Sequence, residues 1–257
     1  MMKRVRRFFK YFIVGLLVII TLVFLLILLD NDYQKEVKLN ENLLPIPQKT
    51  YTPTTDSSVF HQLKAKFGKN KTLPKGYEMQ ALIALSHYPE LIDVPIEFVQ
   101  HEAYIPLSSR PDPLTLLLPW KKRKYLVVIS TKSVKAFESI LLKNLPYNGQ
   151  VGVFGHELAH TVDYLDKSAL KVVQIAYNYA TSGAFQKTFE RATDLRSIKH
   201  GLGYQLRSMS KDITNKIKQN PALAKEVGRT KDNYYTPEEI DQQITKMPKL
   251  YKSEVIK

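Results

Sequence analysis

The segment GHELAH, residues 155 to 160, places two histidines four positions apart and a glutamate directly after the first histidine. On an α-helix each residue advances by about 100°, so His156 and His160 differ by only about 40° and point the same way, one turn apart. With His156 at zero, the apolar residues fall between about 160° and 240°, on the opposite side of the helix. These residues are Val151, Phe154, Leu158, Val162 and Leu165. The pattern predicts a helix that packs its back into a core and presents both histidines to a cleft.

The residue types limit which metal such a helix could bind and how. The chain contains no cysteine, so any metal site must use histidine and carboxylate ligands. The HExxH pattern is typical of zinc enzymes, in which the glutamate acts as general base on a metal-bound water. Glu157 lies about 100° from His156 around the helix and is the expected base. The alternative is an ordinary glutamate on an exposed helix face.

A catalytic zinc usually has three protein ligands, so the sequence should supply one more. A metzincin would continue the motif with a glycine and a third histidine, but this chain has Asp163 and Asp166 at those positions, which excludes that class. Further along, Glu190 and Asp194 are four residues apart on a predicted helix and share one face. Glu190 could be the third ligand, and Asp194 could accept the free N–H of a ligand histidine. The alternative is a solvated acidic face beside two arginines.

The joint pattern HExxH followed by ExxxD resembles the gluzincin metallopeptidases, and within them the HtpX and CAAX prenyl endopeptidase group. The resemblance covers roughly residues 148 to 204. It implies one Zn²⁺ per chain, with His156, His160 and Glu190 as ligands, Glu157 as base, and Asp194 supporting a ligand histidine.

Two features depart from that group. Its members have several membrane spans where this chain has one candidate, and they commonly carry alanine where this chain has Thr193. Substrate and topology are therefore not carried over from the resemblance.

Several further residues are candidates for supporting roles. His200 and Tyr204 follow Glu190 closely and could stabilise a developing oxyanion, although single histidines and tyrosines are more often packed or exposed. His200 is also a conceivable alternative third ligand. Asp163 falls on the predicted metal side of the helix. The β-branched run KYLVVIS, which ends at Ser130, resembles the edge strand that receives peptide in zincins, or it is a plain core strand.

The N-terminus predicts a membrane anchor. Residues 12 to 29 contain no charge and would span about 27 Å as a helix, close to the thickness of a bilayer core. Two aspartates follow the run, at positions 30 and 32, and basic residues precede it: Lys3, Arg4, Arg6, Arg7 and Lys10. This asymmetry predicts a single-pass membrane protein with a cytoplasmic N-terminus and an extracytoplasmic catalytic domain. A cleaved signal peptide is the alternative, but no small-x-small cleavage site follows the run.

The order of expected elements predicts the fold class and the domain boundaries. Strands are expected early and helices late, which indicates an α+β fold, a zincin-like domain with a small sheet followed mostly by helices. We expect a basic flank at residues 1–10, a transmembrane signal-anchor helix at 11–29, a proline- and threonine-containing stalk at 30–58, and a zinc metallopeptidase-like domain at 59–257.

These features together predict a membrane-anchored zinc endopeptidase that acts on a peptide or protein substrate. The formal net charge of +14 also predicts attraction to anionic envelope polymers or lipid headgroups, or it serves solubility alone; nucleic acid is not an expected partner. Two alternatives remain: a basic, membrane-tethered envelope-binding or scaffolding domain with structural zinc or none, and a zinc amidase that acts on cell-wall peptide.

Overall fold

The structure is a computed structural model that describes residues 10–18, 21, 39–54, 56–118, 122–227 and 231–251. Its α-helices are α2 (Ser57–Phe67), α3 (Glu78–Ser86), α4 (Tyr147–Leu165), α5 (Ala169–Thr181), α6 (Gly183–Ser197), α7 (Gly203–Gln219), α8 (Pro221–Val227) and α9 (Pro237–Thr245). Its strands are β1 (Lys71–Thr72), β2 (Ile96–His101), β3 (Leu107–Pro111) and β4 (Tyr125–Ser130). The short helical turns are η1 (Glu41–Leu43), η2 (Pro89–Leu91), η3 (Pro113–Thr115), η5 (Lys135–Ile140), η6 (Leu142–Asn144), the π-helical η7 (Ile198–Leu202) and η8 (Lys231–Asn233).

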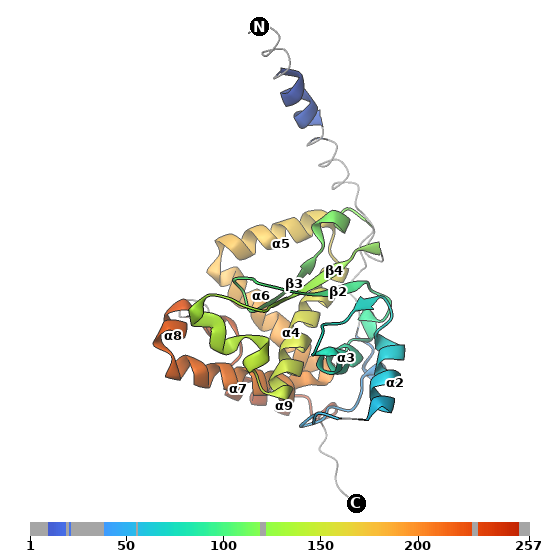
Figure 1. Cartoon of the computed structure of the whole chain (residues 1–257), viewed down its shortest axis with the longest axis vertical. Helices are drawn as coiled ribbons and strands as arrows, with labels where there is room; N and C mark the ends of the chain where they lie inside the picture. The colour runs from blue at the N-terminus through green and yellow to red at the C-terminus, as the bar shows by residue number, and fades with distance from the viewer. Residues whose placement is uncertain are drawn as a thin grey trace, which may run out of the picture.

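The four strands form one mixed sheet in the order β1-β2-β4-β3. Strands β1, β2 and β4 are parallel, and β3 runs antiparallel to β4. The side chains of β4 are buried on both faces except at Leu126, which explains its nearly continuous run of β-branched and other apolar residues. The protein is thus a mixed α+β structure with a small sheet and mostly helices, as the order of elements predicted (Figure 1).

Helix α4, which carries the GHELAH segment, lies at the centre of the domain and contacts α3, α6, α7 and β3. Its apolar side is fully buried at Val151, Phe154 and Leu158, as the periodicity predicted. Helix α7 approaches α4 closely at Gly152, where a Cβ atom would lie 2.3 Å from the backbone oxygen of Gln205. Glycine is required at this position because two helix backbones are almost in contact there.

Helix α6 crosses α4 and continues through the π-helical turn η7 into α7. Ser182 caps its N-terminus by accepting a hydrogen bond from the backbone N–H of Phe185. The direction of the chain changes at Gly201, whose φ of 86° lies in the left-handed region that favours glycine. The chain bends at this glycine, and α7 begins two residues later.

The predicted transmembrane helix over residues 11–29 is not borne out. Part of this span lies outside the described residues; in the described part, residues 10 to 18 and residue 21 are helical. Among all described residues, no helix is both long and apolar enough to cross a membrane. The predicted single-pass topology, with the catalytic domain outside the cytoplasm, is therefore not supported. Most of the predicted basic flank and the first part of the predicted stalk lie outside the described residues.

The structure decides between the two interpretations of the run KYLVVIS, in favour of a core strand. The run KYLVVIS forms β4, which pairs with β2 on one side and β3 on the other, so it is not an edge strand. The edge strand beside α4 is β3, which ends at Pro111. The segment SVKAFESILLKNL, with its helical spacing, forms the two short 3₁₀ turns η5 and η6.

Candidate metal centre

The two histidines of GHELAH project from the same side of α4. The centroids of the His156 and His160 rings are 4.8 Å apart and the rings are nearly perpendicular. The residues are only 4% and 7% exposed, so their ring nitrogens are largely removed from bulk water. A pair of buried imidazoles one helical turn apart can bind one ion together, as the spacing predicted.

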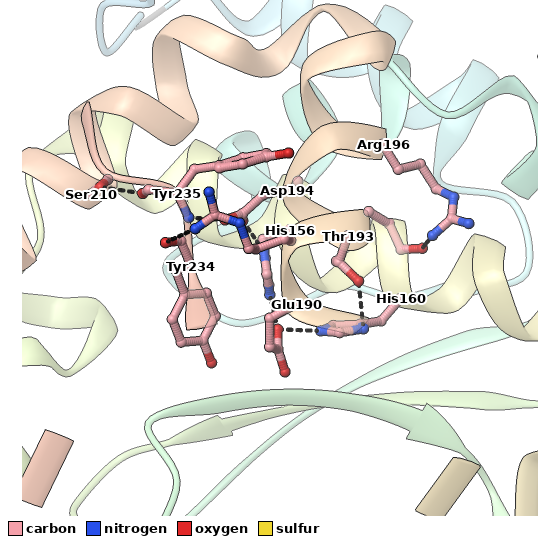
Figure 2. Close-up of polar contacts among 12 residues, drawn as sticks. His156, His160, Glu190, Thr193, Asp194, Arg196, Ser210, Tyr234 and Tyr235 are labelled. Carbon is pink, nitrogen blue, oxygen red and sulfur yellow. Dashed lines mark hydrogen bonds and ion pairs between the residues drawn. The ribbon is translucent and has the colours of Figure 1, made fainter. Parts of the chain in front are cut away.

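Glu190 on α6 completes a three-residue group with the two histidines. Its Oε2 atom lies 3.1 Å from Nε2 of His156 and 3.3 Å from Nε2 of His160. One ligand atom from each residue lies within 4.8 Å of the other two, and all three residues are buried. This ligand cluster of His156, His160 and Glu190 can hold a metal ion (Figure 2).

Hydrogen bonds at the far side of each imidazole fix which nitrogen faces the centre. Nδ1 of His156 lies 2.8 Å from Oδ1 of Asp194, a carboxylate that only accepts. Nδ1 of His160 lies 3.2 Å from the hydroxyl oxygen of Thr193, which already donates its own hydrogen to the carbonyl of Phe189. Both Nδ1 atoms are therefore the protonated nitrogens in the neutral rings, and both Nε2 lone pairs point at the carboxylate of Glu190.

This arrangement suits a cation at the centre of the cluster. Two nitrogen lone pairs and a carboxylate oxygen face one another within about hydrogen-bond distance, and they repel unless a proton or a metal ion lies between them. The pKa shifts of His156 and Glu190 also arise from the closeness of these groups. Burial alone would lower the pKa of His156, but Asp194 and Glu190 hold it well above its usual range. Burial would raise the pKa of Glu190, but His156 and His160 hold it far below its usual range.

Glu157 lies beside the ligands on α4 and is not engaged by them. The residue is 6% exposed, and its Oε2 atom has no hydrogen-bond partner among the described residues. Burial raises the pKa of Glu157, while the charges of His160 and His156 oppose that shift. The backbone N–H of Ser109, on β3, also interacts with this carboxylate. A buried carboxylate with a free oxygen and a raised pKa is well suited to accept a proton.

Two tyrosines with no recognisable sequence motif also lie at the cluster. The hydroxyl of Tyr179, on α5, donates to Oε1 of Glu190 at 2.6 Å. The ring of Tyr234, just before α9, lies 5.7 Å from the ring of His156. The chain has 15 tyrosines, and no spacing relative to the HExxH motif distinguishes these two, so only the folded arrangement identifies them.

The Asp194 carboxylate connects the cluster to the C-terminal part of the chain. One oxygen accepts from His156, and the other accepts from the backbone N–H of Tyr235 at 2.8 Å. The sequence predicted that Asp194 could accept from a ligand histidine. The bond from the backbone N–H of Tyr235 was not predicted, because Tyr235 belongs to no recognisable motif. Figure 2 shows Asp194 between the His156 ring and the backbone at Tyr235.

Three other residues considered from the sequence have their contacts elsewhere. His200 is buried between Glu90, at 3.0 Å from Nε2, and the stacked ring of Tyr88. Tyr204 packs edge-on against Tyr251. Asp163 pairs with Arg196 at 2.8 Å. The expected roles of His200 and Tyr204 as oxyanion donors, and of His200 as an alternative ligand, therefore find no support in the geometry.

Comparisons with protein families, with curated proteins and with solved structures find no match for this chain.

Proposed function

We propose that this protein is a zinc-dependent peptidase of the gluzincin type. The observation that carries the proposal is the ligand cluster itself: two imidazoles and one carboxylate converge, with a free buried carboxylate, Glu157, beside them. Two histidines and a glutamate are one of the ligand sets typical of catalytic zinc, and three protein ligands leave a position for water. Zinc is favoured over magnesium or calcium because two of the three donors are nitrogen.

When bound, zinc would lower the pKa of a coordinated water and polarise the substrate carbonyl. The protein's own residues perform the proton transfers. Glu157 accepts a proton as the water oxygen bonds to the carbonyl carbon, and the C=O electron pair moves to the oxygen. Glu157 then passes this proton to the amide nitrogen as the C–N bond breaks, which yields a carboxylic acid and an amine. Asp194 and Thr193 hold the two ligand histidines in one tautomer throughout.

The outer edge of β3 offers a place for the substrate backbone. Pro106 accepts from Ser130 and Asp112 donates to Lys124 across the β3–β4 pair. Because such bonds alternate along an antiparallel pair, Leu107 and Ser109 direct their backbone polar groups away from β4. The Ser109 N–H interacts with the Glu157 carboxylate, so this edge of β3 adjoins the expected base. A peptide added here as an extra strand would be bound mainly through its backbone.

The decisive experiment measures metal content and peptide cleavage in the full chain. We expect about one zinc per chain, loss of cleavage of a randomised peptide library on chelation, and recovery when zinc is restored. In Glu157→Gln, zinc should stay bound while kcat falls by about 10²–10⁴-fold, the usual contribution of a general base. The matched control is Glu41→Gln, an exposed position. Absence of stoichiometric zinc, or unchanged cleavage in Glu157→Gln, would refute the proposal.

A further inference from the structure

The two carboxylate oxygens of Glu190 have different partners. Oε2 faces the cluster, at 3.1 Å from Nε2 of His156 and 3.3 Å from Nε2 of His160. Oε1 instead accepts a hydrogen bond from the hydroxyl of Tyr179 at 2.6 Å. Glu190 is only 3% exposed, so bulk water has little access to replace this donor. The Tyr179 hydroxyl therefore determines which carboxylate oxygen faces the two histidines.

Tyr179 is itself held in place by residues of α6. Its backbone carbonyl accepts a hydrogen bond from the side-chain amide of Gln186 at 2.6 Å. Its ring packs edge-on against Phe189, with 6.0 Å between the ring centroids. Ser182 alone connects α5 to α6 and serves as a cap for both helices. These contacts limit the movement of the phenol relative to Glu190, so the donor is preorganised.

A second phenol orients the first. The hydroxyl of Tyr234 is hydrogen-bonded to the hydroxyl of Tyr179. Because the hydrogen of Tyr179 is directed at the Glu190 carboxylate, Tyr234 is the donor in this bond. Two hydrogen bonds in series polarise each other, so the bond to Glu190 is stronger than an isolated one. In Figure 2 the Tyr234 hydroxyl points to the same side as the Glu190 carboxylate.

The segment that carries Tyr234 thus supports two of the three residues of the cluster. The backbone N–H of Tyr235 donates to Oδ2 of Asp194 at 2.8 Å, and Asp194 in turn accepts from His156. The side chain of Tyr234 reaches Glu190 through the other phenol. Two adjacent residues therefore orient a histidine on α4 and a glutamate on α6.

We propose that Tyr179 is a positioning residue that fixes the Glu190 carboxylate with Oε2 toward the metal ion, and that Tyr234 acts through Tyr179. Without the Tyr179 hydroxyl, Oε1 would be a buried acceptor with no partner, and the carboxylate would be free to rotate. This assignment rests on the proposed function in one respect: it presupposes that the cluster binds zinc. It does not depend on which bond the protein hydrolyses.

Tyr179→Phe, Tyr234→Phe and the double variant test the assignment in the full chain, because each change removes a hydroxyl and keeps the ring. The matched control is Tyr177→Phe, also on α5 and 67% exposed. Competition with a chromophoric chelator gives the dissociation constant for Zn²⁺. The visible absorption spectrum of the protein loaded with Co²⁺ in place of Zn²⁺ reports the arrangement of ligands around the ion, and it requires no catalysis.

We expect Tyr179→Phe to raise the dissociation constant for Zn²⁺ by about 10–100-fold, the usual effect of losing the partner of a metal ligand, and to change the Co²⁺ spectrum. Tyr234→Phe should have a smaller effect in the same direction. The double variant should bind Zn²⁺ no more weakly than Tyr179→Phe alone, because Tyr234 acts only through the missing hydroxyl. Tyr177→Phe should match the wild type in both measurements.

An unchanged Zn²⁺ affinity in Tyr179→Phe would overturn the assignment. A weaker affinity with an unchanged Co²⁺ spectrum would also overturn it, because the hydroxyl would then serve only the stability of the fold. If Tyr234→Phe weakens binding equally with and without the Tyr179 hydroxyl, the coupling between the two phenols is refuted. If Tyr179→Phe does not fold, Tyr234→Phe decides, and an unchanged Co²⁺ spectrum in that variant overturns the assignment.

These outcomes are separable from the failure of the proposed function. A wild-type chain that binds zinc but cleaves no peptide would overturn the peptidase and leave the role of Tyr179 to be decided by the two metal measurements. A wild-type chain that binds neither Zn²⁺ nor Co²⁺ would overturn both proposals.

Discussion

The hydroxyl oxygen of Thr193 accepts a hydrogen bond from Nδ1 of His160, with 3.2 Å between the two atoms. The same hydroxyl donates to the carbonyl of Phe189 one turn earlier, so its own hydrogen is committed and its lone pairs face the imidazole. The threonine thus accepts from Nδ1 of His160 as Asp194 accepts from Nδ1 of His156. Each histidine of the cluster thus has its own acceptor on α6.

The first prediction concerns this bond. Thr193→Ala should raise the dissociation constant for zinc by up to about 10-fold, at the low end of the range for partners of ligand histidines, because a neutral hydroxyl is a weaker acceptor than a carboxylate. Thr193→Ser keeps the oxygen and should restore most of the affinity. Competition with a chromophoric chelator measures both constants. Equal affinities in wild type and Thr193→Ala would show that the hydroxyl does not orient His160.

The second prediction concerns the stability of the domain in acid. His87 is fully buried; its Nδ1–H donates to the carbonyl of His200, and its Nε2 accepts from the hydroxyl of Tyr51. Burial lowers the pKa of His87 to about 4. Because the folded pKa lies below the unfolded value of about 6.5, the unfolded state binds the proton more readily, and stability falls as the pH drops from about 6.5 to 4.

The loss attributable to His87 should reach about 3 kcal/mol at pH 4, from about 1.4 kcal/mol per pH unit. Urea unfolding at a series of pH values gives the slope directly. In His87→Gln this part of the pH dependence should disappear, even if the variant is less stable overall. His61→Gln, at an exposed position on α2, is the control and should keep the wild-type slope. The idea is wrong if His87→Gln also keeps that slope.

The third prediction concerns the contact between α4 and α7. Gly152→Ala would place a methyl group 2.3 Å from a backbone oxygen, so the two helices must separate. We expect a loss of about 1–3 kcal/mol or more in the free energy of unfolding. Gly183→Ala, at the start of α6 where no atom lies within 4 Å of the added carbon, should be neutral or slightly stabilising. Chemical denaturation of both variants checks the prediction, and equal effects would contradict it.

The parts of the site that the sequence predicted are those determined by position along a helix. The side of α4 that carries His156 and His160, and the shared face of Glu190 and Asp194, follow from a fixed rotation per residue. The contact between α4 and α6 has no such local signal, and their convergence could be expected only from the resemblance.

The sequence predicted least where an interaction depends on strand order or on loops. The residues of β4 were recognisable as a strand, but the antiparallel return of β3, which makes β3 the edge, depends on long-range pairing. Pro111 can end β3 at that position because proline is tolerated on an edge strand. Tyr234 reaches the cluster only because α9 packs on α7, and nothing local to Tyr234 indicates this.

The bond between Asp194 and the backbone of Tyr235 has a consequence for synthesis on the ribosome. A nascent chain that has emerged only through α6 already contains every ligand, yet Asp194 then lacks its second partner. The bond can form only after the chain beyond residue 235 has left the exit tunnel. A metal ion bound earlier would be held by a histidine whose supporting carboxylate is still free to rotate, so we expect such an ion to be retained fully only late in synthesis.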